Sequence, residues 1–332
     1  MLVGSMMQAQ SDSTAAKKYF SVAGNADLYY RYAMNKTPSS TSPTYDHARI
    51  GLGWTNLLAE ADFEHWGAAL ELGAGERASQ LYYAEGEHYS HLIQGYVYAN
   101  MGENLRASIG TFTTPFNYEY TEPSSNGNYT NTFIYTVIAA SYSGLKLDYT
   151  LNDNWSVMAA LFGDSDRRKL KGSSPHFSAQ LNYGGETTNN SIDFVMGKDG
   201  DSTQAMMVDC FGDHRFTDRF LLGWQLHLMT DNDEVYGKSK WWGIALYFQE
   251  QFSSRFSLNL RSEWYDDSDG YWFGATNLHI FSNTLTGKFV LHPFILMPEI
   301  RLDNGSSPVF EQKNGSFGKQ ELSYLLGASV VF

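Results

Sequence analysis

The chain has 332 residues, a formal net charge of −13 and a single cysteine, Cys210. This length suits two soluble domains or one large β architecture. The acidity argues against binding to nucleic acid, whose phosphates require basic patches, and one cysteine excludes an intrachain disulfide. No stretch approaches 18 consecutive apolar residues, so we expect no transmembrane helix. Strands of about 9–11 residues with alternate apolar positions remain able to cross a bilayer.

The first 20 residues are expected to precede the folded domain. Met1–Gln10 contains a short apolar run and a small residue, Ala9, near its end, as in the tail of a secretory signal. A basic n-region is missing, so we interpret residues 1–20 as the remnant of a signal peptide with a disordered polar stretch. Residues 21–332 are interpreted as one domain.

From residue 21 onward, apolar residues recur at every second position, which is the period of a β-strand. In 25–34, Leu28 and Tyr30 share one face, and Asp27 and Arg31 share the other. Such alternation needs one apolar and one wetter environment. Strands are predicted at roughly 21–34, 48–63, 66–77, 91–101, 105–112, 140–151, 155–163, 176–183, 191–198, 204–216, 220–230, 240–252, 256–265, 272–285, 288–303 and 320–332.

The links between these strands are predicted to alternate strictly between short turns and long loops. Short turns are expected at 102–104, 152–154, 217–219, 253–255 and near 286–287, and long loops at 36–46, 78–90, 113–139, 164–175, 231–239, 266–270 and 304–319. This sorting predicts an all-β fold, a single antiparallel transmembrane β-barrel of about 16 strands with short periplasmic turns and long extracellular loops. The apolar phase flips between Trp54 and Leu57 and again around Met297-Pro298, where we expect bulges.

The stretch from Gly110 to Tyr149 carries two short motifs. The first, G-x-F-x-T-P-F-x-x-E, ends at Glu119, and the second, S-G-L-x-x-x-Y, begins at Ser143. In this order the motifs resemble the OmpL-like β-barrel porins, the second putative porin family of bacterial outer membranes. The resemblance extends more weakly from Asn25 to Phe332. It implies a porin in the bacterial outer membrane.

Aromatic residues concentrate at predicted strand ends, where amphipathic rings would form girdles at the two membrane interfaces. The predicted girdle residues are Trp66, Trp155, Trp241, Trp242, Trp264, Trp272 and Phe332. The other interpretation is that these Trp side chains anchor the core of a soluble β protein. The C-terminal Phe332 also resembles the signal read by the outer-membrane assembly machinery.

Charges of both signs fall on the predicted lumen face, as in a water-filled barrel. The acids are Asp27, Glu60, Asp62, Glu71, Asp148, Asp193, Asp209, Asp213, Glu263, Glu299 and Asp303, and the bases are Arg31, Arg49, Arg77, Arg106, Lys146, Arg215, Arg261 and Arg301. The strings Arg261-Ser-Glu263 and Glu299-Ile-Arg301-Leu-Asp303 look alike, and similar strings recur in the family named above. Two roles are open for them, a ladder of ion pairs that stiffens the wall or contact with solute.

The long loop Thr113–Tyr135 is rich in Tyr and lightly charged, so we predict that it folds inward and narrows the lumen. Its Tyr118, Glu119 and Glu122 would then line the constriction, and the two glutamates would face basic wall residues. The expected partners are Arg31, Arg49 and Arg106. Because acids modestly outnumber bases on the lumen face, a weak preference for cations is expected.

The sequence contains little that indicates a catalytic or metal-binding site. No Ser-centred elbow, HExxH or paired-Cys motif occurs, so no catalytic residue and no cofactor is predicted. His88-Tyr-Ser-His91 is the closest His pair, and its alternative role is that of a solvated loop. The acidic stretches 231–234 and 266–270 could bind Ca²⁺ through oxygen ligands, although neither has the EF-hand spacing.

The sequence therefore predicts an outer-membrane porin, a passive diffusion channel for small hydrophilic solutes or ions. Its expected partners are the lipid bilayer, the solutes and the assembly machinery. The alternative function is that of a non-conducting barrel, a scaffold or accessory subunit of an outer-membrane complex whose lumen the long loop blocks. A third possibility is a barrel hydrolase with catalytic side chains at its outer end.

Overall fold

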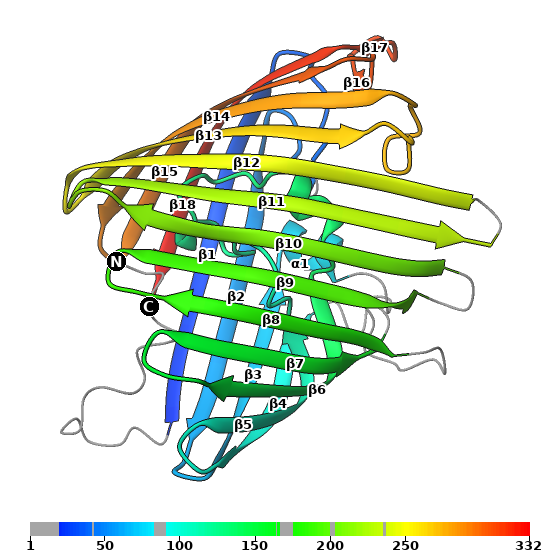
Figure 1. The fold of residues 1–332 in the computed structure, drawn as a ribbon. Helices are drawn as coiled ribbons and strands as arrows, with labels where there is room; N and C mark the ends of the chain where they lie inside the picture. The colour runs from blue at the N-terminus through cyan, green and yellow to red at the C-terminus, as the bar shows by residue number, and fades with distance from the viewer. Residues whose placement is uncertain are drawn as a thin grey trace.

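Sixteen long strands of the computed structural model close into one antiparallel barrel (Figure 1). The structure describes residues 20–41, 43–82, 91–163, 165–166, 175–199, 203–234 and 237–332. The barrel strands are β1 (Phe20–Ala33), β2 (Arg49–Asp62), β3 (Trp66–Ala74), β4 (Leu92–Met101), β5 (Leu105–Thr113), β6 (Ser141–Thr150), β7 (Trp155–Phe162), β8 (His176–Gly184), β9 (Thr188–Asp199), β10 (Thr203–Arg215), β11 (Phe220–Asp233), β12 (Gly237–Ser253), β13 (Phe256–Asp267), β14 (Leu278–Leu291), β15 (Phe294–Gly305) and β18 (Gln320–Val331). Each pairs with the next, and β18 closes the barrel against β1, which leaves no free edge. The predicted fold class is confirmed.

The remaining elements lie in the long connections. They are α1 (Glu76–Leu81), η1 (Pro123–Ser125), α2 (Phe133–Val137) and a small sheet of β16 (Phe310–Glu311) and β17 (Phe317–Gly318). No helix in the described part of the chain is long and apolar enough to cross a membrane. Of the predicted signal-peptide remnant only Phe20 lies within the described residues, and it begins β1.

Short turns gather at one end of the barrel, which we call the short-turn end, and most long connections gather at the other, the long-loop end (Figure 1). β1 begins and β18 ends at the short-turn end, as an even number of strands requires. The predicted strict alternation fails at two links, because only residues 200–202 join β9 to β10 and only 234–236 join β11 to β12. In the second case, β11 and β12 stay paired as far as Asp233 and Gly237, since ladder hydrogen bonds satisfy the backbone beyond the predicted strand ends.

The turn between β14 and β15 lies at His292-Pro293, and the predicted turn near Thr286-Gly287 is wrong. Thr286 continues the ladder with Glu299, and Gly287 pairs with Leu258 of β13. The glycine is therefore an interior strand residue, and the chain reverses six residues later. The prediction failed because a Gly gives a turn signal in sequence even where, as here, it lies inside a strand.

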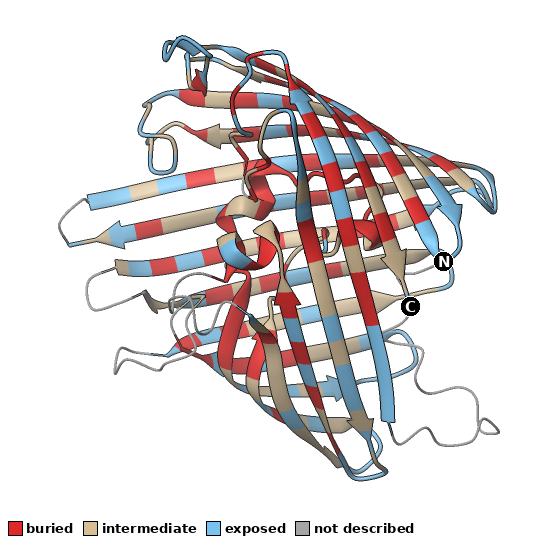
Figure 2. Cartoon of the chain, turned by 180° about the vertical axis from the view of Figure 1, so that it is seen from behind, coloured by how far each residue is buried: buried red, intermediate tan, exposed pale blue. Residues whose placement is uncertain are grey.

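Alternate side chains point outward and inward, as the period of two predicted. In β13, Leu258 and Leu260 are 37% and 39% exposed, whereas Asn259 and Arg261 are 3% and 1% exposed. Bands of buried and exposed residues alternate along the other strands in the same way (Figure 2). The outer face is consequently a belt of exposed apolar side chains, which suits a lipid environment rather than water.

The bulge predicted near Trp54 is present, because the β1–β2 ladder shifts register between Ala26 and Leu28, opposite residues 52–55. The second predicted bulge is wrong, since the β15–β18 ladder runs through Met297 and Pro298 without a shift. Met297 is an apolar residue that points inward.

Most predicted girdle residues point outward. Trp66, Trp155, Trp264 and Phe332 are exposed in this way. Trp272 is also exposed, but it lies in the β13–β14 loop and meets the ring of Trp241 edge-on. Trp241 is an exception, because it is fully buried inside the barrel near the start of β12. Strand alternation assigns the two neighbouring Trp residues to opposite faces.

Candidate functional site

The β5–β6 connection, residues 114–140, packs against inward-facing side chains of the barrel, and we call it the inner segment. Its ribbon lies between opposite walls in both side views (Figures 1 and 2). Pro123 begins the 3-10 turn η1, a position where its missing N–H costs nothing. Thr132 caps α2, since its side chain accepts a hydrogen bond from the Tyr135 N–H at 3.0 Å.

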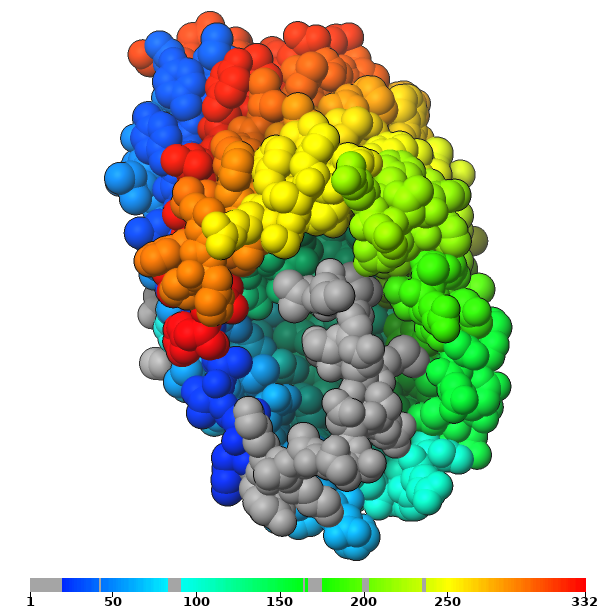
Figure 3. Space-filling model, turned by 90° about the vertical axis from the view of Figure 1, so that its left-hand side faces the viewer, coloured from blue at the N-terminus to red at the C-terminus, as the bar shows by residue number. Residues whose placement is uncertain are grey.

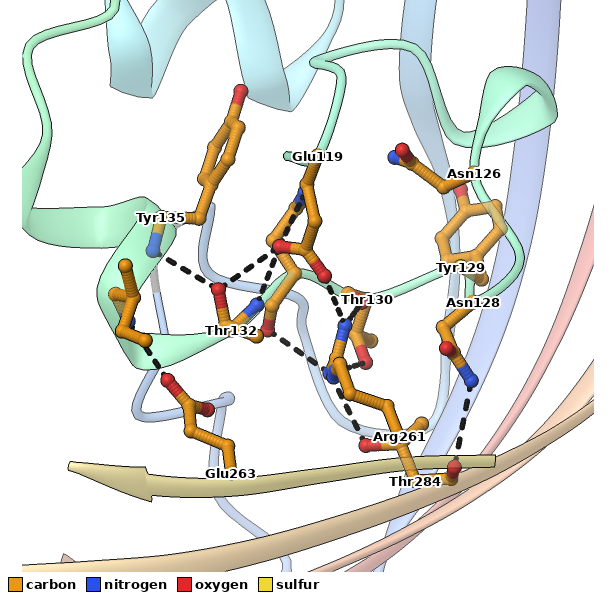
Figure 4. Close-up of polar contacts among 12 residues, drawn as sticks. Glu119, Asn126, Asn128, Tyr129, Thr130, Thr132, Tyr135, Arg261, Glu263 and Thr284 are labelled. Carbon is orange, nitrogen blue, oxygen red and sulfur yellow. Dashed lines mark hydrogen bonds and ion pairs between the residues drawn. The ribbon is translucent and has the colours of Figure 1, made fainter. Parts of the chain in front are cut away.

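Arg261 of β13 is the centre of the contact between wall and inner segment (Figure 4). Its guanidinium forms a 2.7 Å ion pair with Glu119, and both side chains are buried. It also donates to the Thr130 carbonyl, to the Asn131 carbonyl at 3.2 Å and to the Thr284 hydroxyl at 3.1 Å. A planar guanidinium with five donors suits such a convergence of acceptors.

Glu119 is itself held by the inner segment. Its second carboxylate oxygen accepts the Thr132 N–H at 2.8 Å and the Thr132 hydroxyl at 3.0 Å. The residue at the start of the inner segment is thereby tied both to the start of α2 and to β13. We expect these contacts to keep the segment folded as one unit.

Two wall glutamates accept backbone N–H groups of the inner segment. Glu263 binds the N–H groups of Phe133 and Ile134, at 2.9 and 2.8 Å, at the start of α2. These groups have no partner within a helix, and a carboxylate is favoured at this end of the helix dipole. Glu299 likewise accepts the N–H groups of Tyr129 and Thr130, at 2.7 and 3.2 Å.

Further contacts come from basic residues of β14 and β15. Arg301 donates to the Asn131 carbonyl at 2.6 Å and to Asp303 at 2.9 Å. Lys288 donates to the carbonyls of Ser124 and Asn126, at 2.6 and 2.8 Å.

On β1, Asn25 donates to Glu122 at 2.6 Å and to Ser124 at 2.7 Å. Asp27, also on β1, accepts the Tyr129 hydroxyl. The inner segment therefore contacts β1 on one side of the barrel as well as β13–β15.

Arg77 of α1 holds the inner segment from a second loop. It donates to the carbonyls of Thr121 and Tyr129, at 2.9 and 2.7 Å, and to the Asn131 side chain at 2.5 Å. The guanidinium is fully buried and lies 5.7 Å from the centroid of the Tyr129 ring. The sequence placed Arg77 on the lumen face but gave no signal for these partners.

Apolar side chains of the inner segment enter three separate buried clusters. Phe133, Ile134 and Val137 pack in a large cluster with residues of β5–β14. Tyr135 joins a second cluster with Trp54 and α1, and Tyr129 joins a third with residues of β1, β15 and β18. The nine residues from Tyr129 to Val137 thus contact three sectors of the wall.

The phenols of the inner segment remain neutral. Burial raises the pKa of Tyr118 and Tyr129 well above the usual range and that of Tyr135 to about 12. Tyr118 lies against the Tyr247 ring, with centroids 4.3 Å apart, and over Gly223, where a Cβ atom would overlap its hydroxyl. A larger residue at position 223 would therefore displace this ring.

The predicted partners of Glu119 and Glu122 are wrong. Arg31 instead pairs with Glu321 at 2.6 Å, and both side chains are buried. Arg49 pairs with Asp46 at the exposed start of β2. Strand alternation predicted the face of each arginine but not its depth along the barrel, and depth decides the partner.

Near the short-turn end the inward-facing charges stay in contact with solvent. Lys146 and Asp148 form a 2.8 Å ion pair with side chains 23% and 36% exposed. Arg106 is exposed, donates to Asn100 at 3.0 Å and lies 4.1 Å above the Tyr98 ring. A view from this end shows the surface hollowed (Figure 3). These residues, rather than Arg261, Glu263, Glu299, Arg301 and Asp303, are the charges that a dissolved solute can reach.

Candidate metal sites receive no support from the geometry. No group of three or more His, Cys, Asp and Glu side chains in the described ranges could hold a metal ion. The carboxylates of Asp266 and Asp267 accept backbone N–H groups of the β13–β14 loop. Asp266 accepts the Ser268 N–H at 3.0 Å, and Asp267 accepts the Tyr271 N–H at 2.9 Å. The predicted pair His88/His91 lies partly outside the described residues.

Comparison with known proteins agrees with this geometry. No curated protein sequence matches the chain. Among solved structures, the anion-selective porin from Comamonas acidovorans superposes with a TM-score of 0.67 at 12% identity, covering 94% of this chain and 99% of that one. The trimer form of OmpT, an outer membrane protein of Vibrio cholerae, gives 0.65 at 10% identity, covering 94% and 99%. A mutant of the Rh. blastica porin gives 0.56 at 11% identity, covering 94% and 100%. At these identities the similarity shows the fold.

The family is shown by the sequence itself. The family described as "putative beta-barrel porin-2, OmpL-like" matches residues 19–332, which is nearly the whole chain and the whole barrel. The outward apolar belt and the absence of a free strand edge fit the same assignment. The chain belongs to this OmpL-like family of β-barrel porins of the bacterial outer membrane.

Proposed function

We propose that the protein is a passive diffusion channel for small hydrophilic solutes and ions, with a lumen narrowed by the inner segment. The observation that carries the proposal is that the inward-facing Lys146–Asp148 pair and Arg106 stay in contact with solvent near the short-turn end. The surface of the barrel is hollowed at this end (Figure 3). A wall that served only to bury the segment would not need charges of both signs in water. The mechanism involves size and electrostatics and no chemical step.

The selectivity would be set by the solvated charges. Near the short-turn end, three acidic residues outnumber two basic ones on the predicted lumen face. The acids are Glu60, Asp62 and Asp148, and the bases are Arg106 and Lys146. Glu119 is neutralised by its contact with Arg261, so it contributes little to the field that a passing ion meets. We therefore propose a mild preference for cations. The anion selectivity named for the Comamonas porin belongs to that protein.

The proposed test is solute uptake by proteoliposomes. Vesicles that contain the purified protein should swell in solutions of small neutral solutes, at a rate that falls steeply with solute size. Heat-denatured protein in the same vesicles is the control. Swelling no faster than in this control would contradict the proposal.

One observation favours the alternative, a non-conducting barrel that acts as a scaffold or accessory subunit. The inner segment enters apolar clusters on three sectors of the wall, as a plug would. Under this alternative, the vesicles would not swell even for the smallest solutes. Deletion of residues 123–130 would then turn a closed barrel into an open one rather than widen an existing path.

We also propose the two terminal roles that the sequence predicts. Phe332 would serve as the assembly signal, since its exposed ring ends the chain while its backbone pairs with Gly24 at 3.0 Å in both directions. Phe332→Ala should lower the amount of folded barrel in the outer membrane and leave the refolded protein intact in detergent. Met1–Gln10 would be the remnant of a signal peptide, which the N-terminal sequence of protein isolated from the outer membrane would test.

A further inference from the structure

We infer that a groove on the outer face of β9–β12 is a binding site for a phosphorylated lipid of the membrane leaflet at the long-loop end. This inference goes beyond the proposed channel function, because it concerns the face of the barrel that meets the bilayer. The four strands lie side by side (Figure 1). Side chains near their long-loop ends and in the β13–β14 loop line the groove, which has a volume of about 450 Å³.

The register of the four strands places their outward-facing side chains in rows around the barrel. One row is wholly apolar and contains Phe194, Val208, Leu228 and Trp242. The next row toward the long-loop end contains Met196, Met206, Thr230 and Lys240. The row beyond it is wholly polar and contains Lys198, Gln204, Asn232 and Lys238. The groove lies over the second and third rows, where the apolar belt ends.

The tryptophan of the first row indicates the level of the membrane interface. Trp242 points outward beside the buried Trp241, and Trp264 on the neighbouring strand is exposed outward as well. Amphipathic rings prefer the headgroup region of a bilayer. Lysines one and two rows farther out can reach the same region, because their methylene groups cover apolar surface while the ammonium group stays in water. The groove therefore lies at the depth of lipid headgroups.

Three lysines supply positive charge at the groove. Lys238 and Lys240 line it, and Lys198 lies opposite Gln204, which lines it as well. The chain carries a formal charge of −13, so a group of bases on one outward-facing sector does not follow from its composition. Clustered basic side chains at a membrane surface bind anionic lipid headgroups.

Two carboxylates also border the groove. Asp231 points inward from β11 and is buried. Asp269 of the β13–β14 loop is exposed, and its carboxylate accepts the Lys240 backbone N–H at 2.9 Å. This hydrogen bond satisfies the β12 backbone beyond the end of the β12–β13 ladder, and it leaves the ammonium group of Lys240 to a ligand.

Two methionines supply the apolar half of the groove. Met196 and Met206 lie opposite each other on β9 and β10, and they are 41% and 36% exposed. Unbranched thioether side chains adapt their shape to a flexible partner such as an acyl chain. A free phosphate would use only the lysines, and an uncharged lipid would use only the methionines. A lipid that carries a phosphate group at the end of its acyl chains uses both.

The test is a titration of the purified protein with dioleoyl phosphatidic acid, followed by native mass spectrometry. The protein is held in a polyoxyethylene detergent with EDTA, which removes divalent cations that could bridge Asp269 to a phosphate. We expect one saturable binding event. Replacing the three lysines by glutamine should weaken it about 100-fold, at about fivefold for each lysine. This variant combines Lys198→Gln, Lys238→Gln and Lys240→Gln.

Two further variants separate the role of these lysines from a change in net charge or in folding. Arginine at the same three positions keeps the charge and should retain the binding. The matched control removes three exposed lysines from other connections at the same end of the barrel and should bind as the parent does. It combines Lys36→Gln, Lys313→Gln and Lys319→Gln. A heat-dependent gel shift verifies that each variant folds.

Two probes separate the halves of the ligand. Dioleoylglycerol lacks the phosphate group and inorganic phosphate lacks the acyl chains, so each should bind more weakly than dioleoyl phosphatidic acid. Absence of saturable binding, equal affinity of the two glutamine variants, or dioleoylglycerol binding as tightly as the phosphorylated lipid would overturn the inference. Inorganic phosphate binding as tightly as the lipid would also overturn it, because the site would then hold a free anion. Since the groove lies outside the lumen, these outcomes do not depend on whether the barrel conducts.

Discussion

Replacing Arg261 by alanine removes the side chain that makes most contacts between the wall and the inner segment. Breaking a buried ion pair from one side costs about 3–5 kcal/mol. Glu119 keeps two hydrogen bonds to Thr132, so the lower end, about 3 kcal/mol, applies. The strand ladder of β13 does not depend on this side chain, and the cost therefore falls on the seating of the segment. At about 1.4 kcal/mol per factor of ten, the unseated population should rise about 150-fold.

The rate of thiol modification measures this population. Ile134 is fully buried in the inner segment, so a cysteine introduced there in a Cys210→Ser background reacts only when the segment unseats. Arg261→Ala should speed modification by the same factor, about 150-fold, when opening and closing are fast. Arg106→Ala is the matched control, since this exposed arginine also points inward but bonds to Asn100.

A second variant separates the lost charge from the lost contacts. Combining Arg261→Met with Glu119→Gln removes both members of the ion pair, which leaves no buried charge alone and should restore most of the protection. Equal modification rates in Arg261→Ala and Arg106→Ala would refute the claim that the wall arginine holds the inner segment.

Three further predictions concern the barrel and its lumen. Deletion of residues 123–130 removes the segment's contacts with Lys288 and should raise the rate of vesicle swelling several-fold, whereas an unchanged rate would mean that these residues do not narrow the path. In cells that carry Cys210→Ser, a membrane-impermeant maleimide should label a cysteine at Ser307 but not one at Ser254, and the reverse pattern would invert the topology. Reversal potentials should show a mild cation preference that grows at low salt, because a Debye length of about 8 Å at physiological salt screens most lumen charges. Asp148→Lys should shift the preference toward anions, and no shift would place the selective charges elsewhere.

Much of the barrel could be predicted from the sequence because each strand separates lipid from a wetter interior. In β13 the alternation of Leu258, Leu260 and Trp264 with Asn259 and Arg261 is enough to assign every side chain to a face. The end of β14 and the start of β15 are harder to predict from the sequence, because a glycine inside a strand gives the same local signal as a turn. Short helices such as α2, with five residues, are stabilised by tertiary contacts rather than by propensity, and the sequence did not reveal them.

The contacts of the lumen charges could not be predicted for a different reason. Alternation shows that Glu263 and Glu299 point inward, but their partners are backbone groups about 130 and 170 positions away in the sequence. Ion-pair ladders along the wall and solute contact were the two roles considered for these residues. The geometry supports a third role, in which the wall carboxylates hold the backbone of the inner segment.

Single-channel recording in planar bilayers tests the central claim most directly. The purified protein should insert as a channel with a small, stable conductance, because we propose that the inner segment narrows the lumen while the inward-facing charges near the short-turn end stay in contact with solvent. The variant lacking residues 123–130 should show a markedly larger conductance in the same salt. A parent protein that inserts, as verified by its heat-dependent gel shift in the recovered membrane, and carries no current would contradict the proposed channel and favour the non-conducting barrel.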